Sequence, residues 1–219
     1  MAGPSRKRIV DALLERHGKT YAAEVGIDLA KGTPSVLFRW LCASILLSAR
    51  IGAGLAMQAA RALGDQGWTT AQRMAAATWE QRTRTLNEAG YARYDESTSR
   101  MLGDTAEMLL DHYAGDLRKL REAAGRDVER ERKLLKECKG LGDVGVDIFL
   151  REVQLAWDEL YPFADGRALR AAERLGLEGD AKALAKHTPR QEFPRLVAAL
   201  IRTGLAKDFD GVLGHAKKR

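Results

Sequence analysis

Cysteine and clustered histidine are scarce in this sequence. Cys42 and Cys138 are its only two cysteines, which excludes a disulfide framework and leaves too few thiolates for a zinc or iron–sulfur site. The four histidines, at positions 17, 112, 187 and 215, are scattered, so no helical histidine pair suggests a metal site. We therefore expect a protein of a reducing cytoplasm that carries no cofactor.

Long apolar runs and alternating strand patterns are also missing. The longest apolar run, LCASILLSA at residues 41–49, is far too short to span a bilayer, and the basic stretch MAGPSRKRIV lacks the apolar core of a signal peptide. No segment of alternating β-branched residues is long enough for a convincing strand. These absences predict a cytoplasmic all-α protein without a membrane partner.

Helix-start and helix-stop signals recur along the chain. Thr33 and Pro34 predict the N-cap and first position of a helix that is apolar nearly all round between residues 41 and 47, as expected for a central buried helix. Thr78 and Gln81 form a capping-box pattern, and Gly90 follows as a stop. The pattern favours an all-α fold.

Positive charge gathers in one segment. The formal net charge is +6, and residues 117–139 hold nine Lys/Arg against five Asp/Glu, directly before a glycine-rich stretch. A basic segment beside a phosphate-binding loop suits a polyanion. The alternative is a solvated helix face with ion pairs between residues four apart.

The glycines at 140, 142 and 145 have the G-x-G-x-x-G spacing of a dinucleotide site. That site needs a preceding buried strand and a surrounding βαβ unit, but the preceding VERERKLLKEC is charged and helix-forming. What remains is a helix, a tight glycine turn and a second helix that begins near Asp143 or Val144. Its free N–H groups and positive dipole end suit one DNA phosphate. Alternatively, the glycines serve only a corner between two helices.

Three stretches together resemble a known family. LLKECKGLGDVGVDIFL resembles the helix-hairpin-helix motif of the endonuclease III superfamily of DNA glycosylases, whose hairpin typically has the sequence L-P-G-V-G. LFRWLCASILLSAR is similar to the family's first long helix, and YPFADGRALRAAERLGL to the segment with its catalytic aspartate. The resemblance covers roughly residues 8 to 205. It implies an endonuclease III-like all-α fold of two lobes: a central domain at 34–153 that holds the hairpin, and a second lobe formed by 1–33 and 154–219.

The resemblance implies that Asp165 is the catalytic residue. A carboxylate beside C1′ stabilises the oxocarbenium-like state of glycosidic bond cleavage and orients the attacking water. Asp165 is also a good N-cap for the following GRALRAAERL, and the two roles can coexist. The family's lyase lysine falls on Val144, which implies base excision without strand cleavage. A displaced lysine, Lys136 or Lys139, remains an alternative nucleophile.

The family's DNA contacts also map onto this chain. Arg50 matches a polar plug that fills the gap left by the flipped base, and Tyr91 matches a wedge opposite it. The alternatives are a favourable cation at a helix C-terminus for Arg50 and a hydrophobic contact after a glycine cap for Tyr91. The hairpin residues expected at the DNA are Lys139, Gly140, Gly142, Val144 and Gly145.

The hairpin of this family often binds Na⁺ or K⁺ through backbone carbonyls. By position these belong to Lys136, Cys138 and Leu141. Many relatives also carry four cysteines for a [4Fe–4S] cluster, but no cysteine follows Cys138 here. Ser44 stands where the adenine-excising branch has a carboxylate, which argues against adenine as the target base.

The expected function is therefore base-excision repair of double-stranded DNA that bears a lesion or an abasic site, by a monomer associated with the nucleoid. Two alternatives stay open. One is a non-catalytic helix-hairpin-helix DNA-binding protein, and the other is an abasic-site lyase that uses Lys136 or Lys139. The sequence does not name the excised base.

Overall fold

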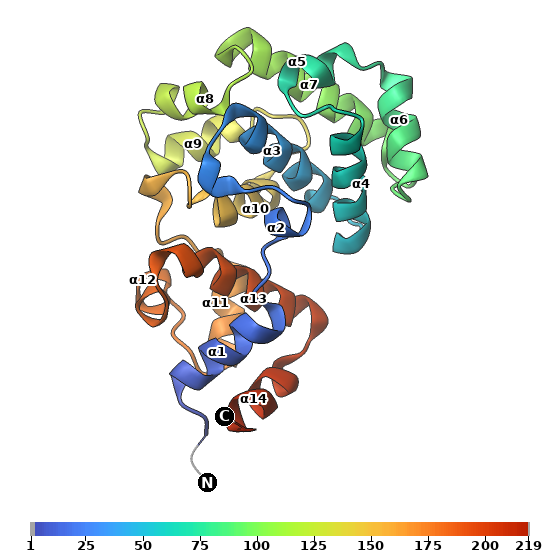
Figure 1. The fold of residues 1–219 in the computed structure, drawn as a ribbon. Helices are drawn as coiled ribbons and strands as arrows, with labels where there is room; N and C mark the ends of the chain where they lie inside the picture. Colours follow the sequence, from blue (N-terminus) through green and yellow to red (C-terminus); the bar gives the residue numbers. More distant parts are fainter. Residues whose placement is uncertain (1–2, 219) are drawn as a thin grey trace. The chain divides into compact units, whose positions relative to one another are not determined.

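The computed structural model describes residues 3–218, which contain helices and turns and no β-strand. The chain divides into a smaller unit, Met1–Tyr21 with Leu160–Arg219, and a larger unit, Ala22–Glu159 (Figure 1). Met1, Ala2 and Arg219, which belong to the predicted second lobe, lie outside the described residues. No helix within residues 3–218 is both long and apolar enough to cross a membrane.

The larger unit is built around a buried helix, α3. Trp40 on this helix is fully buried, and its indole N–H donates to the carbonyl of Phe149 on α10 at 3.0 Å. Helices α4, α7, α8 and α10 all contact α3, as Figure 1 shows around its blue ribbon. The elements of this unit are α3 (Pro34–Ser48), α4 (Ala53–Asp65), α5 (Ala71–Ala76), α6 (Trp79–Glu88), α7 (Asp95–Tyr113), α8 (Leu117–Ala123), α9 (Val128–Leu135), α10 (Asp143–Val153) and the 3₁₀ turn η1 (Leu29–Lys31).

The predicted caps define the ends of several helices. Both bonds of the capping box are present at α6: the N–H of Gln81 donates to the hydroxyl of Thr78 at 3.2 Å, and the N–H of Thr78 donates to the Gln81 amide oxygen at 2.9 Å. Gly90 follows with φ of +80°, a conformation that favours glycine. Pro34 opens α3, whereas Thr33 precedes it without a side-chain capping bond.

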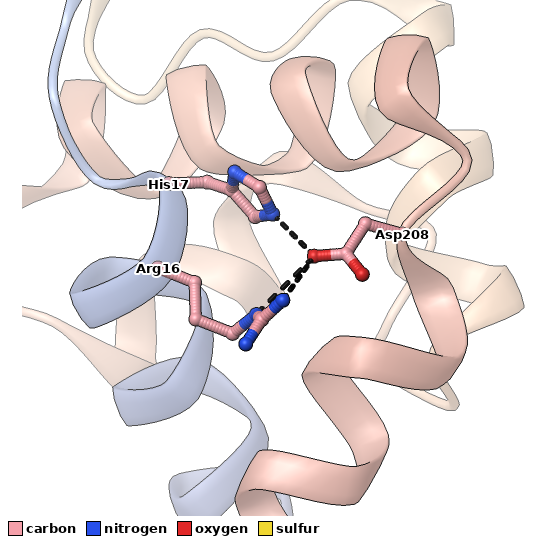
Figure 2. A network of polar contacts seen from close by, with 3 residues as sticks. All are labelled: Arg16, His17 and Asp208. Atoms are coloured by element: carbon pink, nitrogen blue, oxygen red, sulfur yellow. Dashed lines mark hydrogen bonds and ion pairs between the residues drawn. The ribbon is translucent and has the colours of Figure 1, made fainter.

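The smaller unit joins the two ends of the described chain. Helix α13 packs against α1 and α11, and α1 also packs against α14. Figure 2 shows the polar link: Arg16 donates to Asp208 through Nη2 at 2.7 Å, and His17 Nε2 lies 2.8 Å from the same oxygen. Both partners, Arg16 first, hold the pKa of Asp208 below its usual range. The elements here are α1 (Arg6–His17), α11 (Gly166–Arg174), α12 (Ala181–Leu184), η3 (Ala185–His187), η4 (Arg190–Glu192), α13 (Phe193–Ala206) and α14 (Phe209–Lys218).

The boundaries between the units differ from those expected at 33/34 and 153/154. The chain passes from one unit to the other at 21/22, in α2 (Tyr21–Glu24), and at 159/160, in η2 (Asp158–Leu160). Residues 22–33 belong to the larger unit, where the N–H of Ala22 donates to the buried Glu152 carboxylate at 2.8 Å. Residues 154–159 belong there too, because Trp157 packs edge-on against Phe149.

Candidate functional site

The glycine turn between α9 and α10 is fixed by packing. Gly140 has φ of +82°, and a Cβ there would lie 2.7 Å from Met101 Sδ and 3.1 Å from Ile45 Cγ2. The hydroxyl of Ser48, the last residue of α3, is shared between the carbonyl of Ile45 at 2.7 Å and that of Gly140 at 3.0 Å. The buried central helix therefore sets the position of the turn, and only glycine fits there.

The other two glycines differ from each other. Gly145 is buried, and a Cβ there would lie 2.8 Å from Leu141 Cδ1, so this glycine allows the turn to close on itself. Gly142 is exposed, and a Cβ there would meet nothing within 4 Å. Of the two, Gly142 is the one with free space in front of its backbone.

The first turn of α10 presents unoccupied N–H groups at this surface. The backbone amides of Asp143, Val144 and Gly145 donate to no group within residues 3–218, as expected for the first turn of a helix. Val144 is 41% exposed. Lys136 forms an ion pair with the Asp143 carboxylate, and its hydrogen bond and charge lower the pKa of Asp143. The acidic residue beside these amides is therefore neutralised locally.

Backbone oxygens at the turn are partly engaged. The carbonyl of the exposed Lys139 accepts the hydroxyl of Thr105 at 3.2 Å, and the carbonyl of Cys138 accepts the N–H of Leu141 at 3.1 Å. Each carbonyl keeps a second lone pair, and such oxygens suit a hard cation. The Na⁺ or K⁺ site at Lys136, Cys138 and Leu141 stays a prediction. Residues 3–218 contain no cluster of three His, Cys, Asp or Glu that would hold a metal ion.

Asp165 begins helix α11 in the smaller unit. Its Oδ1 accepts the backbone N–H of Arg167 at 2.7 Å and of Ala168 at 3.2 Å, which confirms the predicted N-cap. The side chain is only 6% exposed. Two amide donors and the positive end of α11 therefore hold a single carboxylate in one fixed orientation. Its catalytic role stays a prediction.

The two residues expected at the base gap have different positions. Arg50 is exposed just after the end of α3, as a plug requires. Tyr91 is fully buried, and its hydroxyl donates to the carbonyl of Leu46 at 2.9 Å, so this structure does not expose the ring that was expected to act as a wedge. Leu55, which no sequence motif indicated, is 40% exposed, and its Cδ2 would lie 3.2 Å from a Cβ at Gly90. An exposed apolar side chain beside that turn is the type that enters a base stack.

Three of the tryptophans have structural roles. Trp40 and Trp157 are buried in the core of the larger unit. Trp79 donates its indole N–H to the carbonyl of Glu96 at 3.2 Å. Ser44, discussed above for base preference, is fully buried and donates to its own helix at the carbonyl of Trp40.

A buried carboxyl group lies just before the hairpin, where the sequence indicated only a charged helix face. Glu131 on α9 is fully buried, and neither of its carboxyl oxygens meets a hydrogen-bond donor among the described residues. Burial first, and then the neighbouring Glu159 carboxylate, raise the pKa of Glu131. Burial is the largest single effect on Glu159 and acts to raise its pKa, but Arg121, Glu131 and a backbone N–H together outweigh burial and lower that pKa. Glu131 is thus the member of the pair that keeps its proton; the charged groups that act on it are Glu159, Arg121 and Asp127.

Replacing Glu131 with glutamine should flatten the fall in stability that the wild type shows between the ordinary pKa of 4.5 and the raised pKa of about 8. In the wild type the unfolded carboxyl ionises near its ordinary pKa of 4.5 while the folded one stays protonated, so stability falls as pH rises toward the raised pKa. The slope is at most about 1.4 kcal/mol per pH unit. The glutamine amide has no such proton to lose. Urea unfolding between pH 5 and 9 measures this, with the exposed Glu129→Gln as control; parallel profiles for wild type and Glu131→Gln would contradict it.

Solved structures of endonuclease III bound to DNA are similar to this chain. A non-covalent endonuclease III–DNA complex matches with a TM-score of 0.50 at 21% identity, over 78% of this chain and 73% of that chain. A trapped endonuclease III–DNA covalent intermediate, an estranged-adenine complex, gives 0.47 at 21% identity, over 74% and 71%. The sequence matches no protein-family model and no curated protein. On the first of these structures, the chain has the endonuclease III-like all-α fold that the sequence predicted.

Proposed function

We propose that this protein is a DNA glycosylase that hydrolyses the N-glycosidic bond of a damaged or mismatched base without cleaving the strand. The observation that supports it most is Asp165, a nearly buried carboxylate fixed at the start of α11, in a chain with an endonuclease III-like fold. Other aspartates that cap helices in the described chain, Asp116, Asp127 and Asp180, are all more exposed than Asp165. The endonuclease III–DNA complexes are consistent with DNA as the ligand.

The proposed reaction has one nucleophile, water. The bond between C1′ and the base nitrogen breaks, and its electrons leave with the base. Asp165 stabilises the positive charge that develops on the sugar and orients the water whose oxygen then bonds to C1′. The proton released from that water is balanced by the proton that the departing base takes up.

The proposed DNA contacts come from the larger unit. The free amides of Asp143 and Val144, with Gly142 beside them, bind one phosphate, and Lys139 adds charge. Arg50 fills the space left by the flipped base, and Leu55 replaces Tyr91 as the wedge. The protein acts as a monomer on double-stranded DNA in the nucleoid.

Strand cleavage is not part of this proposal. The position of the lyase lysine holds Val144, which is no nucleophile. Lys136, one of the two lysines considered as a displaced nucleophile, is engaged in its ion pair with Asp143. Lys139, which is exposed, is the remaining lysine for an abasic-site lyase.

A panel of duplexes tests the proposal. The protein is incubated with duplexes that carry uracil, an oxidised base, an alkylated base, a mismatch or an abasic site. Released base with an intact strand is the expected result. Binding without release on every duplex would replace the proposal with a non-catalytic DNA-binding protein. A borohydride-trapped covalent complex, lost in Lys139→Ala, would replace it with a lyase.

DNA binding should weaken steeply with salt. A footprint of helix-terminal amides and Lys/Arg side chains displaces condensed counterions from the duplex, so the logarithm of the association constant should fall linearly with that of salt concentration. The slope should be about −0.9 for each phosphate that is neutralised. Fluorescence anisotropy on an abasic duplex between about 50 and 200 mM KCl measures it. A flat profile would count against duplex DNA as the ligand.

A further inference from the structure

A cavity of about 390 Å³ opens between α11, α13 and the start of α14, within the smaller unit. This volume is in the range of sites that enclose a small ligand or one anchoring side chain. Asp165 does not line the cavity, nor does any residue assigned above to DNA. The cavity is therefore a separate feature that the proposed glycosylase reaction leaves without a role.

The rim of this cavity is strongly cationic. Arg167, Arg170 and Arg174 follow one face of α11 at spacings of three and four residues, and Lys207 joins them from the end of α13. All four are exposed, and none forms an ion pair within residues 3–218. No Asp or Glu lines the cavity. Four uncompensated cations select an occupant with more than one negative charge.

The base of the cavity is apolar. Leu200 and Ile201 are buried beneath it, and Leu205 is 62% exposed beside it, the most exposed large apolar side chain in the described part of the chain. The ring of Phe209 lies under the Arg174 guanidinium at 4.0 Å, so that face is already covered. Phe209 as a whole is 7% exposed, so the site offers aliphatic contact to an apolar group and little open aromatic surface.

We propose that this cavity binds an acidic segment of a partner protein, which inserts one large apolar side chain and places carboxylates on the arginine rim. A DNA backbone alternates phosphates with sugars and has no protruding apolar side group to fill the cavity or cover Leu205. A nucleobase gains most from an open aromatic face, which Phe209 does not supply. Carboxylates match the planar guanidinium fork in a bidentate manner, and an aliphatic or aromatic anchor matches the floor.

A labelled peptide tests this proposal on the full chain. The probe is fluorescein-Asp-Asp-Glu-Asp-Leu-Phe, and binding is followed by fluorescence anisotropy. Arg170→Glu should weaken binding by at least about tenfold, because it places a carboxylate on the rim. Gly204→Met should do the same by filling the cavity, since a Cβ at Gly204 lies 3.8 Å from Ala171 Cβ, an ordinary contact. Lys182→Glu, an exposed residue of the same unit outside the cavity, should stay within about twofold.

Further probes separate the possible occupants. A peptide with serine in place of Leu-Phe, and one with the acids as amides, should each bind at least about tenfold more weakly. If neither Arg170→Glu nor Gly204→Met changes the affinity for the peptide, the proposal is overturned. Binding of deoxyadenosine monophosphate or a short duplex that is lost in these variants, while the peptide does not bind, would overturn it too. Circular dichroism checks that the variants fold. This assay needs no base release, so its outcome is independent of the glycosylase proposal.

Discussion

Asp165→Asn is expected to reduce base release by about 10²- to 10³-fold while leaving the fold and abasic-site binding intact. Asn keeps an oxygen that accepts the N–H groups of Arg167 and Ala168, and it is as good an N-cap as Asp. It removes the negative charge that would stabilise the developing positive charge on the sugar. Single-turnover base release on the lesion that the wild type cleaves best measures the loss.

A matched control exists in the same unit. Asp180 caps α12 by accepting the N–H of Ala183 at 2.8 Å, so Asp180→Asn makes the same chemical change at a cap with no proposed role in catalysis. Its base release should equal that of the wild type. If Asp165→Asn also turns over at the wild-type rate, Asp165 has no part in the mechanism. A similar loss in both variants would instead point to a general effect of weakening a cap.

Gly142→Asp is expected to lower affinity for duplex DNA by about 10- to 100-fold without loss of thermal stability. Gly142 has φ of −78° and ψ of −170°, which any residue adopts, and a Cβ there meets no atom within 4 Å. An Asp at this N-cap position can accept the amides of the first turn of α10. Its carboxylate would then occupy the place where the phosphate is expected and repel it.

Gly142→Asp should lower the affinity for DNA without lowering the thermal stability, so a loss of binding can be told apart from a loss of folding. Anisotropy on an abasic duplex gives the affinity, and thermal unfolding gives the stability. Gln72→Glu, an exposed position on α5 away from the residues assigned to DNA, adds the same single negative charge to the larger unit and should change affinity by less than about threefold. Equal losses in the two variants would mean that only net charge matters, and would remove the hairpin amides from the DNA contact.

The sequence by itself determined the features that depend on neighbouring residues. The capping box of Thr78 and Gln81, the glycine that follows α6 and the N-cap at Asp165 each close hydrogen bonds over a few positions, so short motifs specify them. The all-α class followed in the same way from periodicity and from the absence of strand patterns. The glycine turn between two helices at Gly140 belongs to this group too, although the close packing that requires glycine there also depends on Met101 and Ile45.

Only the tertiary structure decided which polar and charged side chains are buried and which face water. Tyr91 is buried, and its hydroxyl donates to the carbonyl of Leu46, 45 positions away. Glu131 is buried beside Glu159 although it lies in a run of charged residues. In the sequence, Arg167, Arg170 and Arg174 form an ordinary charged helix face. Only the packing of α13 and Phe209 beside them adds the apolar floor of the cavity. Burial depends on contacts between residues far apart in the chain, and periodicity contains no information about which distant segment supplies the contact.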